Sequence, residues 1–173
     1  MSTSATPTPI QTGLRYGLIV GIIMAIYSVV LQLTSLAQNT ALGLISWAIL
    51  IGGIFWAVRD YRTQHGGFMS FGEGTKTGVM VSVIAGLFTS VFSYVYFKFI
   101  DPTALEKIRD LQITQMEDRG MSDAEIEQAM SFAGVFTSPG GIAIMGILMM
   151  VIFGLIIALI VSAIMKKERP FFS

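Results

Sequence analysis

Few residues in this sequence are of types that carry out chemistry. The chain has no Cys, which excludes thiol catalysis, cysteine metal sites and disulfides. Its single His, His65, lies in a Gln-His-Gly-Gly loop. A lone loop His is usually solvated, and a metal or catalytic cluster could be built on it only with hard oxygen partners. We therefore expect no metal ion, no cofactor and no enzymatic activity.

Phosphate-binding loops and deep charges are also missing from the sequence. Neither Gly-x-x-x-x-Gly-Lys-Ser/Thr nor Gly-x-Gly-x-x-Gly at a strand–helix junction occurs. Functional polytopic proteins often place an ionisable residue at mid-membrane, but the deepest polar side chains here are neutral. They are Gln32, Ser28, Thr89, Ser90 and Ser93. We expect them to hydrogen-bond to their own helix backbone or to a neighbouring helix.

One group of charged residues is a candidate site. Ser70-Phe71-Gly72-Glu73 has the spacing of a capping box that opens a helix. Arg15 and Lys76 lie at a comparable depth on their helices, so we predict that Glu73 pairs with Arg15 or Lys76 and holds two helices together. An alternative use of the nearby basic residues is capture of a lipid headgroup or an anionic solute. Those residues are Arg59, Arg62, Lys166 and Lys167.

The elements that position these residues follow from where charge is missing. Only 13% of the residues are charged, about half of the ~25% typical of soluble proteins. Three stretches carry no charge at all: Tyr16–Val58, Thr77–Phe97 and Gln128–Met165. A membrane span needs about 20 apolar residues, so the last two stretches hold one span each. The first holds two, divided at the polar Gln38-Asn39-Thr40.

The predicted fold is therefore an all-α polytopic membrane protein with four transmembrane helices. Their expected ranges are about 13–36, 41–58, 71–99 and 139–165, within a single transmembrane domain of residues 13–167. We expect a disordered N-terminal tail of residues 1–12 and a C-terminal tail of residues 168–173. The alternative that the first helix is a signal peptide cleaved at Ser35-Leu36-Ala37 is disfavoured, because residues 1–14 lack a positive charge.

A helical hairpin of about residues 102–134 is predicted between the third and fourth spans. Asp101-Pro102 has the pattern of a helix N-cap and Gly120 that of a stop, and Ser122–Glu125 is a second capping box. The hairpin has an apolar side that includes Ile126 and Met130. It could be a lid that binds a partner or ligand. We favour two amphipathic helices resting on headgroups or helix ends, because such contacts require no ligand.

The Lys and Arg residues predict the orientation of the chain. Four spans place seven of them on the side of both termini and four on the side of the hairpin, against three and eight acidic residues respectively. Cytoplasmic loops are enriched in Lys and Arg, so both termini are expected in the cytoplasm of a bacterial cell, with the chain in its inner membrane.

Small residues recur at every fourth position of the predicted spans. Such stripes let helices pack closely in lipid, where no hydrophobic force brings them together. We expect tight packing within the chain, with a homo-oligomer interface as the alternative. The helix-packing residues are Gly13, Gly17, Gly21, Ala25, Gly74, Gly78, Ser82, Gly86, Ser90, Gly154 and Ala158.

The first and third spans also resemble each other. Gly13–Gly17 aligns with Gly74–Gly78, and the second and fourth spans both end in basic segments. A parallel internal repeat, as found in some transporters, is one interpretation. Glycine-rich spans resemble each other in any case, so the repeat stays an open alternative.

Several short motifs carry a resemblance to a known family. They are Arg62 with Gly66-Gly67 and Ser70–Glu73, Tyr96-Phe97 with Phe99–Pro102, Gly120-Met121-Ser122 with Glu125-Ile126, and Phe136–Pro139. Over about Gly13–Lys167 the sequence resembles the bacterial four-helix membrane proteins of domain-of-unknown-function family 4199. The resemblance implies four spans in a bacterial inner membrane and an uncleaved first helix. It implies no activity, ligand or catalytic residue.

Two functions remain after these exclusions. We expect a non-enzymatic scaffold or accessory subunit of a membrane complex, because small-residue stripes and a structured hairpin suit helix and partner contacts. The alternative is a small oligomeric transporter or channel for a small solute. The expected partners are membrane lipids and either other membrane subunits or a second copy of the chain. Nucleic acid is excluded by zero net charge and the lack of a dense basic patch.

Overall fold

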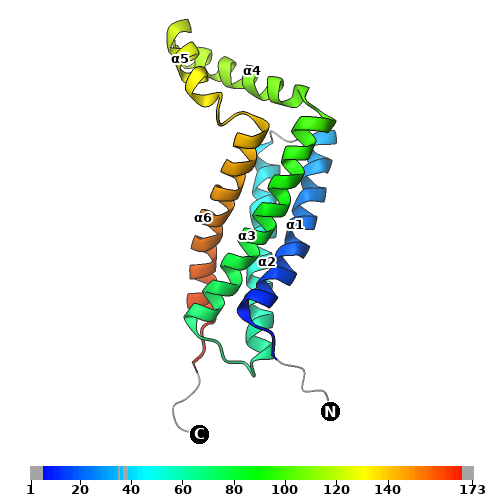
Figure 1. Ribbon diagram of the computed structural model, residues 1–173. Helices are drawn as coiled ribbons and strands as arrows, with labels where there is room; N and C mark the ends of the chain where they lie inside the picture. The colour runs from blue at the N-terminus through cyan, green and yellow to red at the C-terminus, as the bar shows by residue number, and fades with distance from the viewer. Residues whose placement is uncertain (1–5, 35, 37–38, 169–173) are drawn as a thin grey trace. The chain divides into compact units, whose positions relative to one another are not determined.

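The protein is all-α, as the computed structural model in Figure 1 shows. The structure describes residues 6–34, 36 and 39–168, apart from the side chain of Thr40. The helices are α1 (Pro9–Leu33), α2 (Thr40–Gln64), α3 (Phe71–Val95) with the π-helical turn η1 (Tyr96–Ile100), α4 (Thr103–Asp118), α5 (Asp123–Ala133) and α6 (Pro139–Met165).

Four of these helices are long and apolar enough to cross a membrane. They are Pro9–Leu33, Ala41–Gln64, Phe71–Ile100 and Pro139–Met165. An α-helix is the state that satisfies every backbone hydrogen bond inside hydrocarbon, so these runs fold as helices rather than strands. The predicted class, an all-α polytopic membrane protein, is confirmed.

The N-terminal end of α1 differs from the prediction. The helix begins at Pro9, so the expected disordered tail of residues 1–12 is too long, although residues 1–5 lie outside the described part. Thr8 Oγ1 accepts a hydrogen bond from the Gln11 amide at 3.2 Å, and Gln11 Oε1 accepts one from the Thr8 amide at 3.0 Å. This capping box, with Pro9 in the first position, starts the helix before its apolar run.

The later boundaries are set by similar local signals. α1 ends at Leu33 rather than 36, and the Ser35 and Ala37 of the considered cleavage site lie outside the described residues. α2 continues six residues past the predicted Val58, because its last charged turn is still helical. α6 has the predicted bounds.

The predicted hairpin of residues 102–134 consists of α4 and α5. The Asp101 carboxylate accepts hydrogen bonds from the Ala104 amide at 3.2 Å and the Thr103 hydroxyl at 2.6 Å, which caps α4. Glu125 accepts from both the amide and the hydroxyl of Ser122, each at 2.8 Å. Each bond favours the ionised acid, so the pKa of Asp101 and that of Glu125 are lowered.

The chain forms two compact units where the sequence predicts a single domain. Unit one comprises Met1–Thr89 and Leu148–Ser173, and unit two comprises Ser90–Ile147. Both α3 and α6 cross the boundary. The main hydrophobic cluster lies wholly in unit one, whereas unit two is built around the α4–α5 hairpin.

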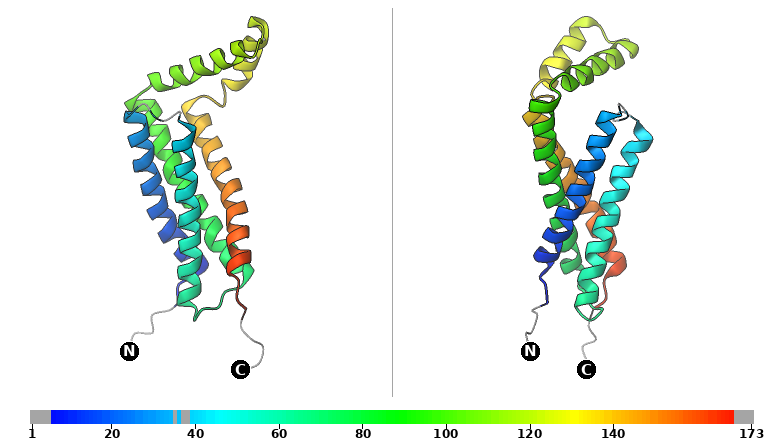
Figure 2. Two further views of the ribbon diagram at one scale, coloured as in Figure 1. Left: turned by 180° about the vertical axis from the view of Figure 1, so that it is seen from behind. Right: turned by 90° about the vertical axis from the view of Figure 1, so that its right-hand side faces the viewer.

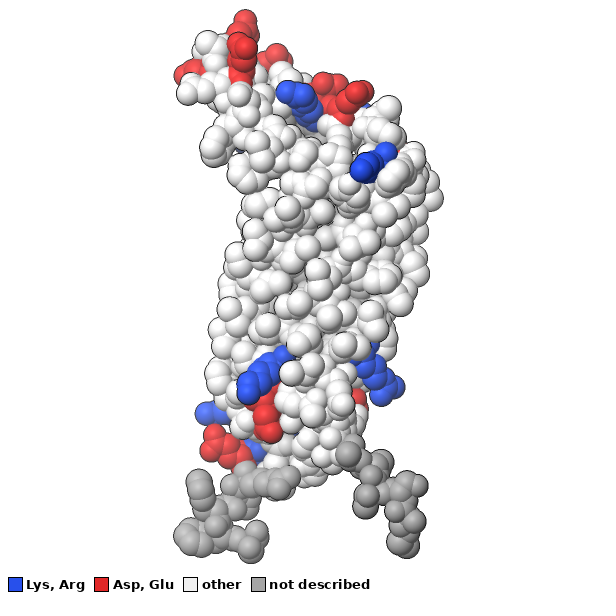
Figure 3. All heavy atoms as spheres, in the orientation of Figure 1, with Lys and Arg blue, Asp and Glu red and all other residues white. Residues whose placement is uncertain are grey.

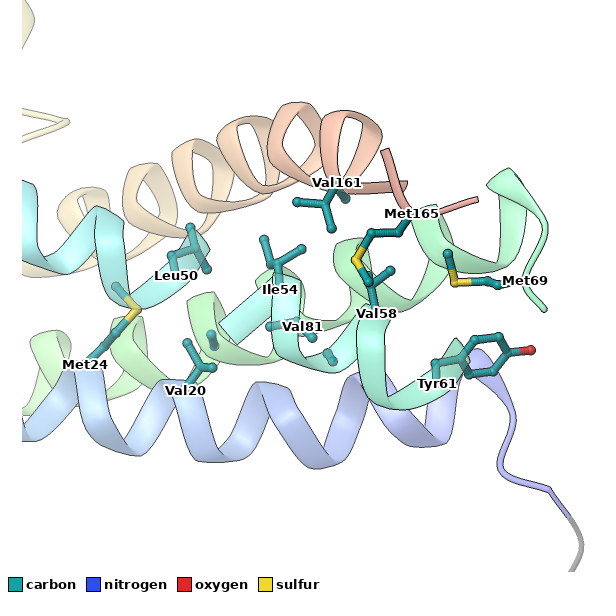
Figure 4. Close-up of a cluster of buried hydrophobic side chains, with 13 residues drawn as sticks. Val20, Met24, Leu50, Ile54, Val58, Tyr61, Met69, Val81, Val161 and Met165 are labelled. Atoms are coloured by element: carbon teal, nitrogen blue, oxygen red, sulfur yellow. The ribbon is translucent and has the colours of Figure 1, made fainter. Parts of the chain in front are cut away.

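Within unit one, α1, α2 and the adjoining parts of α3 and α6 run side by side (Figure 2). Figure 4 shows the cluster between them. Its centre is fully buried and comprises Leu50, Ile54, Val58 and Val81. Large apolar side chains such as Ile26, Trp56 and Ile164 are exposed on the outside. A helix bundle surrounded by lipid exposes side chains that are as apolar as those in its interior.

Candidate functional site

Glycines let α1 approach α3 closely in unit one. A Cβ atom at Gly13 would lie 2.5 Å from Met80 Cβ, and one at Gly17 would lie 2.7 Å from Ile84 Cβ. Ordinary carbon–carbon contacts are about 3.5–4.0 Å. Any side chain at these two positions would therefore push the two helices apart.

Small residues also form the contact between α3 and α6. A Cβ at Gly74 would lie 2.7 Å from Ser162 Oγ, and one at Gly78 would lie 2.6 Å from Ala158 Cβ. A Cβ at Gly154 would collide with Ser82. α3 thus contributes two packing faces, one for α1 and one for α6.

The other residues of the predicted stripes are placed as follows. Gly21, Ala25 and Gly86 are buried in unit one. In unit two, Ser90 is buried and its Oγ would lie 3.3 Å from a Cβ at Gly146. All of the helix-packing residues predicted from the sequence are therefore buried.

The predicted ion pair of Glu73 with Arg15 or Lys76 is not formed. Glu73 Oε2 accepts from the Ser70 amide and hydroxyl, each at 2.8 Å, and Oε1 accepts from the Tyr61 hydroxyl at 3.1 Å. The capping box turns the carboxylate back toward the start of α3, away from Lys76 in the next turn. The bond from Tyr61 links α3 to α2 rather than to α1.

The end of α2 is held by its backbone and by Arg62. The Gly67 amide donates to the Arg62 carbonyl at 2.9 Å and the Gly66 amide to the Thr63 carbonyl at 3.3 Å, which is a Schellman motif. Both glycines have positive φ, of 70° and 84°, which other residues rarely adopt. Arg62 Nη1 donates to the Met165 carbonyl at 3.2 Å and so covers the end of α6.

Two backbone hydrogen bonds join the α2–α3 loop to the segment after α6. The Met69 amide donates to the Lys167 carbonyl at 2.8 Å, and the Lys167 amide donates to the Met69 carbonyl at 2.9 Å. We call the cavity beside this bridge the loop pocket. It has a volume of about 510 Å³ and is lined by His65, Phe68, Met69, Ser70, Glu73, Lys167 and Glu168.

His65 is anchored at the wall of the loop pocket. Its Nδ1 lies 2.8 Å from the Tyr61 carbonyl, and its ring stacks on that of Tyr61 with centroids 4.0 Å apart. A carbonyl oxygen can only accept, so Nδ1 is the donor in this contact. This contact also caps a carbonyl at the end of α2.

The chemistry that the loop pocket could perform is limited. Among the described residues no group of three or more His, Asp or Glu side chains is arranged to hold a metal ion. Of the basic residues considered for anion capture, Arg62 donates a hydrogen bond to the Met165 carbonyl at the end of α6. The Lys167 ammonium lies 5.6 Å from the centre of the Phe68 ring. Arg59 and Lys166 are exposed. The polar groups here mainly close helix ends.

The capping boxes at Ser70 and Ser122 and the hairpin contain the motifs that carry the family resemblance. A family model described as "Protein of unknown function (DUF4199)" matches residues 15–167. The chain belongs to this family. The match covers all of the hairpin and nearly all of the four spans of this DUF4199 chain, so the resemblance predicted from the motifs is confirmed. No curated protein and no solved structure matches the chain.

Several contacts of this DUF4199 chain were missed by sequence reasoning. The Thr8-Pro9-Ile10-Gln11 capping box has a readable signature, since a Thr cap, a Pro at the first position and a Gln at the third are all typical of a helix start. The partnership of Tyr61 with Glu73 has no such signal, because it depends on how two helices meet.

Proposed function

We propose that this DUF4199 chain is a non-enzymatic scaffold or accessory subunit of a membrane complex. The observation that carries the proposal is the division of small residues on α2 between two faces. Gly53 and Ala57 face the core, and a Cβ at Gly53 would collide with Val20. Ala48 is exposed, and a Cβ at Gly52 would meet no atom within 4 Å. No helix in the described part of the chain packs against this second pair.

The outward pair suits a further helix. Ala48 and Gly52 are one turn apart and lie beside the exposed Leu44, Ile51 and Phe55 on the same helix face. Small residues between large ones let a second helix approach closely, and such packing drives association in lipid. The partner is a helix of another membrane subunit or of a second copy of the chain.

The interior of unit one supports a scaffold more than a conduit. Leu50, Ile54 and Val81 fill its centre and are fully buried. The hydroxyls of the buried Thr77 and Ser82 donate to carbonyls of their own helix, at 2.9 and 3.1 Å. These hydroxyls are therefore not available to line a path for a solute.

Purification from native membranes in mild detergent, followed by native mass spectrometry, tests the proposal. We expect a stoichiometric complex that Gly52→Leu disrupts while thermal stability is retained. Ala163→Leu is the matched control, because Ala163 is an exposed small residue on α6. A monomeric wild-type chain without a stoichiometric partner, or equal recovery of the complex with Gly52→Leu, would refute the scaffold.

A small oligomeric transporter or channel is the second candidate function. Two buried hydroxyls, Thr12 Oγ1 and Ser162 Oγ, have no hydrogen-bond partner in the described part of the chain, and an unpartnered buried hydroxyl is a place where a water molecule or a polar solute can bind. Solute flux into liposomes that contain the purified chain would favour this candidate. Liposomes that stay as tight as empty ones would count against it.

We propose that the chain lies in a bacterial inner membrane with both termini in the cytoplasm. Lys and Arg gather at the end of α2 (Arg59 and Arg62) and after α6 (Lys166 and Lys167), as they do at the cytoplasmic ends of spans in inner-membrane proteins. Figure 3 shows charges gathered where the helices of unit one end, with white surface along those helices. Labelling of single cysteines at Thr63 and Gln115 by an impermeant reagent tests this: in intact cells only the second should react.

A further inference from the structure

The α5 helix and the residues after it have two apolar sides. Ile126 and Met130 are buried and, with Ile113 of α4, line the space between the two hairpin helices. A second set faces outward: Phe132, Val135 and Phe136 are 76%, 72% and 44% exposed. The rings of Phe132 and Phe136 lie 5.8 Å apart, so the set forms one continuous patch, which we call the phenylalanine patch.

The patch adjoins a hollow of about 770 Å³. Its walls are Phe132, Val135 and Phe136 together with Ala124, Glu127, Gln128 and Ser131. The unused apolar side of α5 is therefore an open surface, since the contacts with α4 already cover Ile126 and Met130. The packing of the hairpin does not explain its three large apolar side chains.

Chain length keeps the patch near the membrane surface. Pro139 is the first residue of the spanning helix α6, and Phe136 precedes it by three residues. A fully extended chain covers at most about 3.6 Å per residue, so the Cα of Phe136 lies within about 11 Å of that of Pro139. By the same limit the Cα of Phe132 lies within about 25 Å of it. On the other side of the hairpin, Phe99 and Ile100 precede α4, and their side chains are also exposed.

The charges around the patch distinguish between classes of lipid. No Lys, Arg, Asp or Glu occurs from Gln128 to Met165, and the nearest charges on α5 are the acidic Glu125 and Glu127. Helices that bind anionic lipid offer Lys and Arg beside their apolar face, and this one has none. Contact with lipid here must depend on apolar burial alone.

We propose that the phenylalanine patch inserts into the interface of the bilayer and holds α5 on the membrane surface, with no requirement for anionic lipid. The patch precedes α6 in the chain, and the outer side of α6 is also apolar, with Ile144 and Leu148 exposed. Interfacial helices bury such a face by about 5–10 Å into the boundary between headgroups and acyl chains. This inference concerns lipid and does not depend on the scaffold function.

Spin labels at single cysteines test the insertion, because the chain has no Cys of its own. The test positions are Phe132→Cys and Val135→Cys in phosphatidylcholine vesicles. Gln115→Cys, exposed on α4, is the water reference, and Ile152→Cys, exposed on α6, is the lipid reference. Collisions with oxygen report lipid, and collisions with a water-soluble nickel chelate report water.

We expect the ratio of oxygen to nickel collisions at Phe132→Cys and Val135→Cys to exceed that at Gln115→Cys several-fold and to approach that at Ile152→Cys. A ratio equal to that at Gln115→Cys would overturn the proposal. So would labels shielded from both reagents, which would mean that a protein partner or a second copy covers the patch.

Lipid charge provides a second, independent measurement. Replacing a third of the phosphatidylcholine by phosphatidylglycerol should leave the ratio at Phe132→Cys unchanged. A ratio that becomes lipid-like only with phosphatidylglycerol would overturn the claim that apolar burial alone holds the patch. Helical circular dichroism equal to that of the wild type shows that each labelled variant is folded.

Discussion

Gly78→Ala should destabilise the protein although the change adds a single methyl group. The new Cβ would lie 2.6 Å from Ala158 Cβ and 3.0 Å from Ile54 Cγ2. The Ala158 Cβ cannot rotate away, so α3 and α6 must separate by about 1 Å to restore ordinary contacts near 3.5–4.0 Å. Forcing an extra methyl group into a packed core costs about 1–3 kcal/mol.

Gly52→Ala is the matched control for this prediction. Its Cβ would meet nothing within 4 Å, so no packing cost arises against the described residues of the chain itself. Both variants gain the same helix propensity of about 0.5–1 kcal/mol from removing a glycine. The difference in the free energy of unfolding between the two variants therefore isolates the contact of α3 with α6, at about 1–3 kcal/mol.

Reversible unfolding in mixed micelles of mild detergent and dodecyl sulfate measures this difference. Gly78→Ala should unfold at a lower dodecyl sulfate fraction than Gly52→Ala, with the wild type between them or close to Gly52→Ala. Equal midpoints for the two variants would show that α3 and α6 do not pack at the distance described. The small-residue contact would then have no energetic role.

The remaining predictions concern polar contacts. Tyr61→Phe removes the buried hydroxyl that donates to Glu73 and should cost about 1.5–3 kcal/mol in the same unfolding assay, as expected for a hydrogen bond to a charged group; an unchanged midpoint would show that this bond is not made. Arg62→Gln should speed hydrogen exchange of the Met69 and Lys167 amides, because the cover on the end of α6 is lost; mass spectrometry checks this, with Arg59→Gln as the control. Folding lowers the pKa of Glu125, so its capping bonds are fully present above the unfolded pKa near 4.3 and are lost as the pH falls through the folded-state pKa. Amide exchange at Ser122, relative to its intrinsic rate, should therefore accelerate in that acid range. Glu125→Gln should abolish this pH dependence of exchange.

The helices of this chain could be predicted because charge is costly in hydrocarbon. Lys, Arg, Asp and Glu are kept out of the spans, so gaps in charge locate all four. Helix ends follow a different signal. Thr8 starts α1 before its apolar run, and Gly66 and Gly67 end α2 after its charged turn, because capping depends on backbone geometry rather than hydropathy.

The candidate site was predicted less well. Glu73 was expected beside Arg15 or Lys76 because similar depth in the membrane brings opposite charges to one level. Depth does not determine which side of a helix a residue faces. The partner is Tyr61, which the packing of α2 against α3 brings to the carboxylate. The rotation of each helix about its own axis cannot be read from the positions of charges along one sequence. The division of the chain into two units is likewise a property of packing.

The two packing faces of α3 have a consequence for biogenesis. Synthesis proceeds from the N-terminus, so α1, α2 and α3 are made before α6. The contacts of Gly13 and Gly17 with α3 can form while α6 is still being translated. Gly74 and Gly78 stay uncovered until their contacts Ser162 and Ala158 in α6 have been synthesised. A ribosome that stops before α6 releases a chain with one glycine face uncovered in the bilayer, open to any helix that diffuses past.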